Sequence, residues 1–568
     1  MPRAVRPVLY GLSLVPVAAG FLFAATYGVN VPVSDDWSMV GVIARHASGD
    51  LSLSDLFAAH NEHRIFFPRL VTLALAEPTH YDIVAQLFVT QCSLAATAAL
   101  LFLALRRTAA RGALLLLPVV AFLVFSFRQW ELMLLGFSGF AFAGAFGVLA
   151  LLLLTVRGRR LAFAGALGAA TVASYSMFQG LPVWPAGLLL LVLTRAGRRA
   201  WMIPTWVAAG AAEWLLYFHG LRRPAGHPPL SYSFEHPVAA LGYFFTLLGS
   251  ALFPERWPAF ATGIGLLLAA AVAVARTGRR GAREGAAFWL SLMAFSAWML
   301  LSITAGRAGF GVDQALASRY ASYSLLGVIG LLALVAKLWL DRGSRTGLGL
   351  TVMLTALIAV SGFYAVRDGR TSGQLVRTGR ERGAFYLATY RSQPDAHLNE
   401  IYPLPVVVRR LAPSLERMGY TVFAGRGLGH LPPRLGDLER AKDRSLCVID
   451  SINGRRPRST KSREKTVSLA AGTRLIDVNG WCVDAAAGRT AGGAYLILDG
   501  KPYPVRYGSR RADVAMYFHT RAYLHGGFSR QLWPLRLTRG THTISVIAVS
   551  NDRRRAWRRY PTIRLKVA

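Results

Sequence analysis

The chain has 568 residues, of which 53% are hydrophobic, and its mean hydropathy is +0.37. Nearly unbroken apolar runs, such as residues 114–125 and 148–156, exclude a wholly soluble protein and predict a polytopic membrane protein. The formal net charge of +35 comes almost entirely from arginine. In a membrane this charge favours anionic headgroups or phosphate-bearing substrates as partners, and we expect no nucleic-acid partner.

Eleven segments are predicted to cross the lipid bilayer, each near the ~20 residues that a bilayer requires. They are residues 8–28, 82–105, 112–127, 132–156, 161–178, 181–195, 200–218, 258–276, 286–304, 320–340 and 346–366. The first is interpreted as a retained span, because no small-residue cleavage site precedes Asp35.

Alternate loops between the predicted spans contain clusters of arginine, and the positive-inside rule places these loops in the cytoplasm. The clusters are Arg3 with Arg6, Arg106 to Arg111, Arg157 to Arg160, Arg195 to Arg199, Arg276 to Arg283, and Arg342 with Arg345. The apolar stretch 237–253 is therefore interpreted as a re-entrant or interfacial helix, since a further span would move the fifth cluster outside. An odd number of spans places the C-terminal part of the chain outside the cytoplasm.

The first outer loop, residues 29–81, carries an acidic pair, Asp35 and Asp36. Two adjacent carboxylates repel each other, so such a pair commonly faces cations, a metal ion or a proton that it accepts. Ordered loops of this length are commonly functional. We interpret the pair as part of an active site.

The same loop continues with His60, Glu62, His63, Arg64 and Arg69. If residues 54–67 form a surface helix, His60, His63 and Arg64 share one face of it. Together with Asp36, the two histidines are candidate ligands of a divalent cation, because imidazole and carboxylate suit Mn or Zn. The alternative is an interfacial helix whose polar face contacts lipid headgroups.

Further polar groups are predicted at the same outer level. Arg307 and Arg319 end two spans, and arginine binds phosphate oxygens through its planar fork. The alternative for each arginine is snorkelling to lipid headgroups. Candidate substrate contacts from the other outer loops are Arg128, Glu131, Gln179 and Tyr320. No Walker or Rossmann glycine motif is found, so nothing supports a nucleotide-dependent mechanism.

The composition becomes polar after about residue 366, which divides the chain into a transmembrane domain, residues 1–366, and an extracytoplasmic part. Residues 367–465 are predicted to be helices and loops. Residues 466–568 alternate polar and apolar side chains, with a turn at Asp499-Gly500, and predict a small antiparallel β-sandwich. Cys447 and Cys482 either form a disulfide there or remain two buried thiols.

This layout resembles the GT-C superfamily of integral-membrane glycosyltransferases. The resemblance rests on Asp35-Asp-Trp37, on His60-Asn-Glu-His-Arg-Ile-Phe-Phe-Pro-Arg69 and on Ser318-Arg-Tyr320. The stretch Gly480-Trp-Cys-Val-Asp484 to Leu498-Asp-Gly500 is similar to β-rich modules attached to some members.

The resemblance implies transfer of a sugar, with inversion, from a polyprenyl-phosphate donor to a cell-envelope glycan or glycolipid on the outer face of a bacterial plasma membrane. It implies Asp35 or Asp36 as the general base, and Arg64, Arg307 and Arg319 as the groups that stabilise the leaving phosphate. His60, Glu62 and His63 are the local candidates for a divalent cation, Mg or Mn, which only some members use.

Two other functions remain open. The first is a transporter or flippase for lipid-linked glycans, although no internal repeat is evident. The second is an envelope scaffold, because residues 367–568 hold more than twice as many Lys and Arg as Asp and Glu residues.

Overall fold

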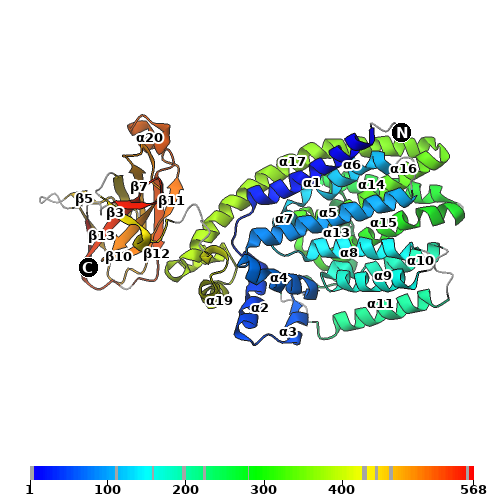
Figure 1. Ribbon diagram of the computed structural model, residues 1–568, viewed down its shortest axis with the longest axis horizontal. Helices are drawn as coiled ribbons and strands as arrows, with labels where there is room; N and C mark the ends of the chain where they lie inside the picture. The colour runs from blue at the N-terminus through cyan, green and yellow to red at the C-terminus, as the bar shows by residue number, and fades with distance from the viewer. Residues whose placement is uncertain are drawn as a thin grey trace. The chain divides into compact units, whose positions relative to one another are not determined.

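The computed structural model describes residues 5–108, 113–156, 159–194, 200–221, 226–278, 280–424, 432–441, 445–459, 465–535, 537–557 and 562–568. Parts of the arginine clusters, such as residues 195–199, lie outside these ranges. The chain divides into two compact units (Figure 1). Unit 1 comprises Met1–Gly28 and Gly41–Arg377, and unit 2 comprises Val29–Val40 and Thr378–Ala568. The acidic pair therefore belongs to unit 2, whereas the rest of its predicted outer loop belongs to unit 1.

Unit 1 is a helical bundle. Its main helices are α1 (Val5–Tyr27), α4 (Phe66–Thr79), α5 (Ile83–Thr108), α6 (Ala113–Val124), α8 (Gly139–Leu154), α9 (Arg160–Ser174), α10 (Val183–Leu193), α11 (Met202–Phe218), α13 (Pro237–Gly249), α14 (Arg256–Thr277), α15 (Arg280–Arg307), α16 (Ala321–Arg342) and α17 (Arg345–Ala388), which continues into unit 2. In the described part of the chain, seven helical segments are long and apolar enough to cross a membrane. The protein is thus a multi-span helical membrane protein.

The prediction of eleven spans is confirmed only in part. The seven long segments contain α1, α5, α6, α14, α15, α16 and α17. The other four predicted spans are helices of 16, 15, 11 and 17 residues, namely α8, α9, α10 and α11. At 1.5 Å per residue these helices are shorter than a hydrocarbon core of about 30 Å. Apolar composition predicted the helices correctly but overstated their length.

The stretch predicted to be re-entrant or interfacial forms α13, a helix of 13 residues. It packs against α14 at a glycine contact, because a Cβ on Gly263 would lie 1.9 Å from the carbonyl oxygen of Phe245. Small residues allow two helix backbones to approach closely in this way. The helix is too short to span a bilayer, which agrees with the predicted departure from a full span.

The bundle has two chemically different ends. We call the end that holds Thr108, Thr155 and Thr194 the arginine-rich end, because the predicted cytoplasmic loops join its helices. The opposite end is built from short elements and is called the loop end. These elements are α3 (Leu53–Phe57), β1 (Ala59–His60), β2 (His63–Arg64), η1 (Phe127–Gln129), α7 (Trp130–Met133), η2 (Phe178–Gly180), α12 (Tyr232–Glu235), η4 (Ala308–Phe310), η5 (Val312–Leu316) and η6 (Ser318–Tyr320).

Unit 2 begins with residues 29–40, which include the start of α2 (Asp36–Ser48), and continues with the end of α17, η7 (Tyr390–Ser392), α18 (Asp395–Asn399) and α19 (Pro405–Met418). A β-rich domain follows. Its strands are β3 (Glu439–Ala441), β4 (Ser445–Ile452), β5 (Arg458–Ser459), β6 (Lys465–Leu469), β7 (Ile476–Asp484), β8 (Arg489–Thr490), β9 (Gly493–Leu498), β10 (Lys501–Pro504), β11 (Arg506–Ser509), β12 (Gly527–Leu532), β13 (Gly540–Val549), β14 (Arg555–Trp557) and β15 (Ile563–Val567). The helix α20 (Ala512–Tyr517) lies between β11 and β12.

The strands form two sheets that share one hydrophobic core. One sheet has the order β10-β9-β13-β15-β6-β5, and the other β11-β12-β7-β4. The alternation along β15 is typical of strands buried on one face, since Ile563, Leu565 and Val567 are buried and the residues between them are exposed. The predicted turn is confirmed: Asp499 and Gly500, both with positive φ, join β9 to β10.

Two details differ from the predicted domain. The pairs β15–β6 and β14–β3 are parallel, so the first sheet is mixed rather than purely antiparallel. Strands β3 and β4 lie before residue 466, so the β-rich part begins earlier than the predicted boundary. Strand β3 has only three residues, and in β4 the apolar residues 446–449 are consecutive, so neither strand shows the alternation that predicted the other strands.

A disulfide joins Cys447 on β4 to Cys482 on β7, where the two residues are direct partners across the strands. Of the two alternatives for these cysteines, the disulfide is therefore the one observed. Disulfides persist in oxidising compartments, which is consistent with an extracytoplasmic location of the β-rich domain.

We expect removal of this cross-link to destabilise the β-rich domain. Replacing Cys447 with Ala and Cys482 with Val opens a loop with a sequence separation of 35. It should lower the free energy of unfolding by about 3 kcal/mol, because the unfolded chain regains conformational freedom. Thermal unfolding in detergent measures the change. The control is Cys92→Ala, which changes an exposed free thiol; equal stability of the double variant and wild type would contradict the prediction.

Candidate functional site

The acidic pair lies at the start of α2 in a segment held by backbone contacts within unit 2. The amide of Ser34 donates to the carbonyl oxygen of Ile401 at 3.0 Å. The amide of Val33 donates to Oδ2 of Asp36 at 3.1 Å, while the amide of Asp36 donates back to the Val33 carbonyl at 3.0 Å. A carboxylate that reaches back to an amide three residues earlier fixes a helix start, as in a capping box.

The two carboxylates differ in exposure. Asp36 is 1% exposed and Trp37 beside it is equally buried, whereas Asp35 is only half-buried. Burial raises the pKa of Asp36 to about 6, although the charge of Arg380 and the Val33 amide act to lower it. Asp36 therefore fixes the conformation of this segment, and Asp35 is the carboxylate that is accessible from solvent.

The burial of Asp36 predicts how stability depends on pH. An unfolded chain loses this proton near the ordinary value of 3.8, and the folded chain loses it near 6. Stability should therefore fall as pH rises from about 4 to about 6 and stay lower above that, by about 3 kcal/mol in total. Asp36→Asn mimics the protonated form, so it should be more stable than wild type at pH 7.5 and equal to it at pH 4.

Thermal unfolding in detergent across this pH range tests the prediction. Asp50→Asn removes an exposed carboxylate from the end of α2 and is the matched control. We expect this control to show no gain at pH 7.5. A variant Asp36→Asn that is less stable than wild type at pH 7.5 would contradict the account.

At the loop end of unit 1, the predicted surface helix over residues 54–67 is wrong. Residues 59–64 instead form a hairpin, in which His60 pairs with His63 and Ala59 pairs with Arg64. Asn61 adopts a φ of 51° at its turn, a conformation that asparagine tolerates better than most residues. Helical spacing suggested a shared face, but the local Asn-Glu turn determines the conformation, so His60 and His63 are neighbours across a ladder.

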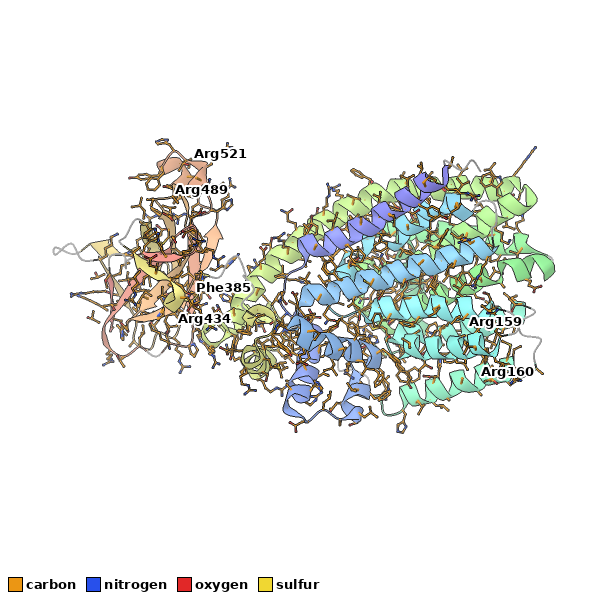
Figure 2. All side chains as sticks on the ribbon, viewed as in Figure 1. Arg159, Arg160, Phe385, Arg434, Arg489 and Arg521 are labelled. Atoms are coloured by element: carbon orange, nitrogen blue, oxygen red, sulfur yellow. A yellow bond between two sulfur atoms is a disulfide. The ribbon has the colours of Figure 1, made fainter. Side chains whose placement is uncertain are left out.

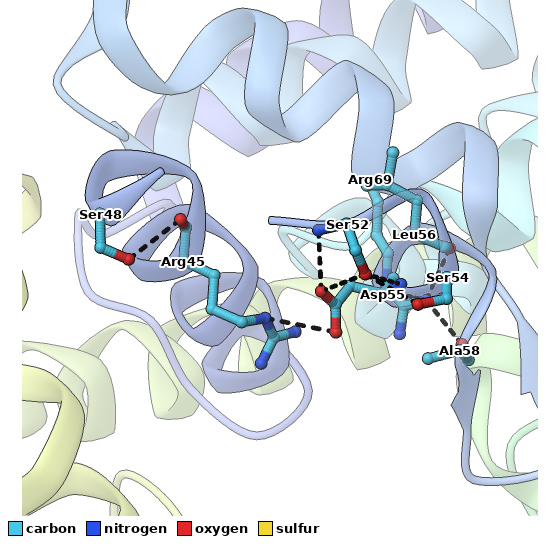
Figure 3. Close-up of polar contacts among 8 residues, drawn as sticks. All are labelled: Arg45, Ser48, Ser52, Ser54, Asp55, Leu56, Ala58 and Arg69. Atoms are coloured by element: carbon cyan, nitrogen blue, oxygen red, sulfur yellow. Dashed lines mark hydrogen bonds and ion pairs between the residues drawn. The ribbon is translucent and has the colours of Figure 1, made fainter. Parts of the chain in front are cut away.

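Arg69 on α4 holds the end of α3, directly before this hairpin (Figure 3). Its Nη1 donates to the carbonyl oxygens of Asp55, Leu56 and Ala58 at 3.1, 2.8 and 2.6 Å. Burial lowers the pKa of the Arg69 guanidinium to about 10. In the same view the side chain of Ser52 caps α3 at the amide of Asp55, whose carboxylate accepts from the Ser52 amide.

The side chain of Arg64 also forms hydrogen bonds with backbone carbonyl groups. Its guanidinium donates to the carbonyl oxygens of Phe57, Tyr217 and His219. Its amide donates to the hydroxyl of Tyr217 at 3.0 Å. An arginine that satisfies three carbonyl groups is typical of structural anchoring, so we assign Arg64 and Arg69 to the scaffold of the loop end.

A first polar cluster gathers around Glu62 at the turn of the hairpin. Its carboxylate forms an ion pair with Arg307, the last residue of α15. It also lies 3.6 Å from Nε2 of His63 and 3.7 Å from Nδ1 of His227. Arg307 in turn lies 3.5 Å from Nε2 of His227. We call these four residues the Glu62 cluster; its side chains combine cationic donors, a carboxylate and two proton carriers.

A second polar cluster gathers around Glu131 on α7. Its carboxylate pairs with Arg319 on η6, and its amide donates to Oγ of Ser318 at 2.9 Å. The guanidinium of Arg319 lies over the ring of Tyr320, 5.0 Å from its centroid. Arg319 and Glu131 stay about one-third exposed. We call these residues the Glu131 cluster; it brings together Glu131, Arg319 and Tyr320, which the sequence placed only at the same outer level.

The remaining predicted contacts are buried. Arg128 is 2% exposed, pairs with Asp368 on α17 and donates from Nε to the carbonyl oxygen of Ser250 at 3.0 Å. Gln179 on η2 is 6% exposed, and its Oε1 has no hydrogen-bond partner among the residues described. Arg128 therefore stabilises the loop end, while Oε1 of Gln179 retains its capacity to accept a hydrogen bond.

No group of three or more His, Cys, Asp or Glu residues gathers to hold a metal ion in the described ranges. The predicted ligands His60 and His63 lie in unit 1 and Asp36 in unit 2. Among the described residues no ligand set thus supports a divalent cation, and no step of the proposed chemistry uses a metal.

Sequence reasoning missed three contributors. His227 joins Glu62 from a loop in which no residue stood out, and Arg380 affects Asp36 from the far end of α17. Asp368 could have been found, because an acid directly after the last predicted span needs a cationic partner.

The sequence matches no protein-family model, and no match is found among curated proteins. The structure identifies the chain as a multi-span helical membrane protein with a C-terminal β-rich domain that contains a disulfide.

Proposed function

We propose that the protein is a membrane glycosyltransferase that moves a sugar from a polyprenyl-phosphate donor to a cell-envelope glycan or glycolipid outside the plasma membrane. The observation that carries the proposal is the acidic pair. Asp36 is buried at the start of α2 and fixes the segment, which leaves Asp35 half-exposed. A carboxylate held in place and reachable by a substrate is suited to general-base catalysis.

The proposed step is a single displacement at the anomeric carbon. The acceptor hydroxyl oxygen forms the new C–O bond while the bond to the donor phosphate breaks, and the bonding pair leaves on the phosphate oxygen. The hydroxyl proton passes to the carboxylate of Asp35. Attack from the face opposite the phosphate inverts the configuration, so no covalent enzyme intermediate is needed.

We propose that Arg307 and Arg319 contact the donor phosphate. Each is paired with a carboxylate, Glu62 or Glu131, and each keeps a part of its side chain exposed. Arginine offers five donors, so one carboxylate does not exhaust it.

An apolar cavity of about 500 Å³ in unit 1 supports a lipid-linked donor. It lies among α10, α13, α14, α15 and α16 and is lined almost wholly by aliphatic and aromatic side chains. Such a lining suits a prenyl chain, which offers no hydrogen bonds.

The β-rich domain is proposed to bind the acceptor glycan. Its α20 exposes Met516 and Tyr517, with exposed fractions of 68% and 77%. Arg489 and Arg521 lie near α20 and are exposed (Figure 2). A tyrosine ring stacks on sugar rings, and arginines bind acidic groups of envelope polymers.

Deletion of the gene followed by linkage analysis of envelope glycans tests the proposal. We expect one sugar linkage to disappear while its lipid-linked precursor accumulates on the outer face. Wild type should restore the linkage. Accumulation of the precursor only inside would favour a flippase, and an unchanged glycan profile would contradict the proposed transfer.

A further inference from the structure

A second cavity, of about 370 Å³, lies at the arginine-rich end of unit 1 and has no part in the proposed transfer. Its walls come from the C-terminal ends of α5, α8 and α10, from the first turns of α15 and from α16 (Figure 1). Unlike the apolar cavity among α10 and α13 to α16, it has a mixed lining to which polar and charged side chains contribute.

Three ionisable side chains line the cavity: Arg107, Glu284 and Lys337. Nζ of Lys337 donates to the carbonyl oxygen of Thr108 at 2.7 Å, and Arg107 is exposed in the last turn of α5. Oγ1 of Thr194 is buried and has no hydrogen-bond partner among the described residues. The lining thus holds two cationic donors and a hydroxyl that lacks a partner.

The charge at this end favours an anion. The C-terminal ends of helices carry only partial negative charge, equivalent to about half a charge each, and Lys337 already offsets that of α5 at Thr108. The sequence places arginines in every loop that joins helices here, against few acidic residues. Full positive charges therefore outweigh the helix ends and the single carboxylate of the lining.

The rest of the lining is mainly apolar and includes Ala104, Leu152, Ala287 and Phe288. A cavity that combines cationic groups and hydrocarbon in its lining matches an amphiphile. Basic pockets between helices on the cytoplasmic side of a membrane bind anionic lipid headgroups in this way.

We propose that this cavity binds a phosphate-bearing ligand, supplied either by a phospholipid headgroup of the inner leaflet or by a soluble phosphate compound. Arg107 binds the phosphate oxygens through its fork, Lys337 contributes a point charge, and Thr194 donates its hydroxyl proton to the ligand. The carboxylate of Glu284 repels the anion and thereby lowers the affinity.

Binding is measured on the purified full chain in neutral detergent, by thermal shift and by native mass spectrometry. The probes are dihexanoyl phosphatidylglycerol, inorganic phosphate and dihexanoylglycerol, which lacks the phosphate. Wild type should bind at least one phosphate-bearing probe and not dihexanoylglycerol. Binding of phosphatidylglycerol alone identifies a lipid headgroup as the source, and competition by inorganic phosphate identifies a soluble ligand.

Three variants test the assignment of residues. Arg107→Gln changes an exposed side chain, so it should fold, and it should weaken binding about tenfold. Glu284→Gln removes the opposing charge and should tighten binding several-fold. Arg160→Ala is the matched control, because Arg160 is exposed at the same end but outside the cavity (Figure 2).

The proposal is overturned if wild type binds neither phosphate-bearing probe or binds dihexanoylglycerol equally well. It is also overturned if Arg107→Gln binds as wild type does, if Glu284→Gln binds more weakly, or if Arg160→Ala loses as much affinity as Arg107→Gln. None of these measurements depends on sugar transfer.

Discussion

Asp35→Asn is expected to lower the rate of sugar transfer by about 10²- to 10⁴-fold, the usual contribution of a general base. The amide occupies the same volume but cannot accept the acceptor's proton. Because Asp35 is half-buried and the helix start is fixed by Asp36, the variant should fold as wild type does. The loss should appear in kcat, with donor affinity little changed.

Two comparisons make this prediction specific. Asp50→Asn removes a carboxylate from the exposed end of α2 and should keep full activity. Asp36→Asn should keep the bond from the Val33 amide through its side-chain oxygen and lose less activity than Asp35→Asn. If Asp36→Asn were the inactive variant and Asp35→Asn the active one, the roles of the two residues would be reversed.

Arg128→Met is expected to destabilise unit 1 by about 4 kcal/mol, because it leaves Asp368 without the cation that balances it in a mostly buried site. Arg128 is 2% exposed and Asp368 is 23% exposed on its side chain, so solvent compensates only a part of the loss. The change also removes a donor from the carbonyl oxygen of Ser250. Unfolding in mixed detergent micelles measures the difference.

Arg256→Met is the matched control, since Arg256 is exposed and lies over the ring of Trp257. It should change stability by less than about 0.5 kcal/mol. Adding Asp368→Leu to Arg128→Met should recover part of the loss, because an apolar pair replaces the ion pair. A stability of Arg128→Met equal to that of the control would show that the ion pair contributes nothing.

The sequence predicted the helices well because long apolar runs have few alternatives in a membrane. Their lengths were harder to predict: α10 has 11 residues although its predicted span covered residues 181–195, since Leu181 and Pro182 continue the apolar run before the helix begins. Period-two alternation predicted β7, β9 and β13 in the same way. Strand β3 has only three residues, and the apolar residues of β4 are adjacent rather than alternate, so neither gave a period-two pattern.

The site was less predictable because its contacts join distant segments. The sequence placed Glu131 and Arg319 in the same outer layer, but it did not predict their ion pair. The helical spacing of His60, His63 and Arg64 was misleading, because a two-residue turn at Asn61 outweighs helix propensity in so short a segment. The roles of Arg64 and Arg128 depend on backbone carbonyl groups, which no side-chain pattern reveals.

The most direct test of the proposed function is transfer by the purified full chain in proteoliposomes. The donor is a polyprenyl phosphate that carries a radiolabelled sugar, and the acceptor is an envelope glycan fraction. We predict that wild type moves the label to the glycan, while Asp35→Asn binds the donor but transfers about 1% as much or less. Equal transfer by Asp35→Asn and wild type, or no transfer by wild type from any such donor, would contradict the account.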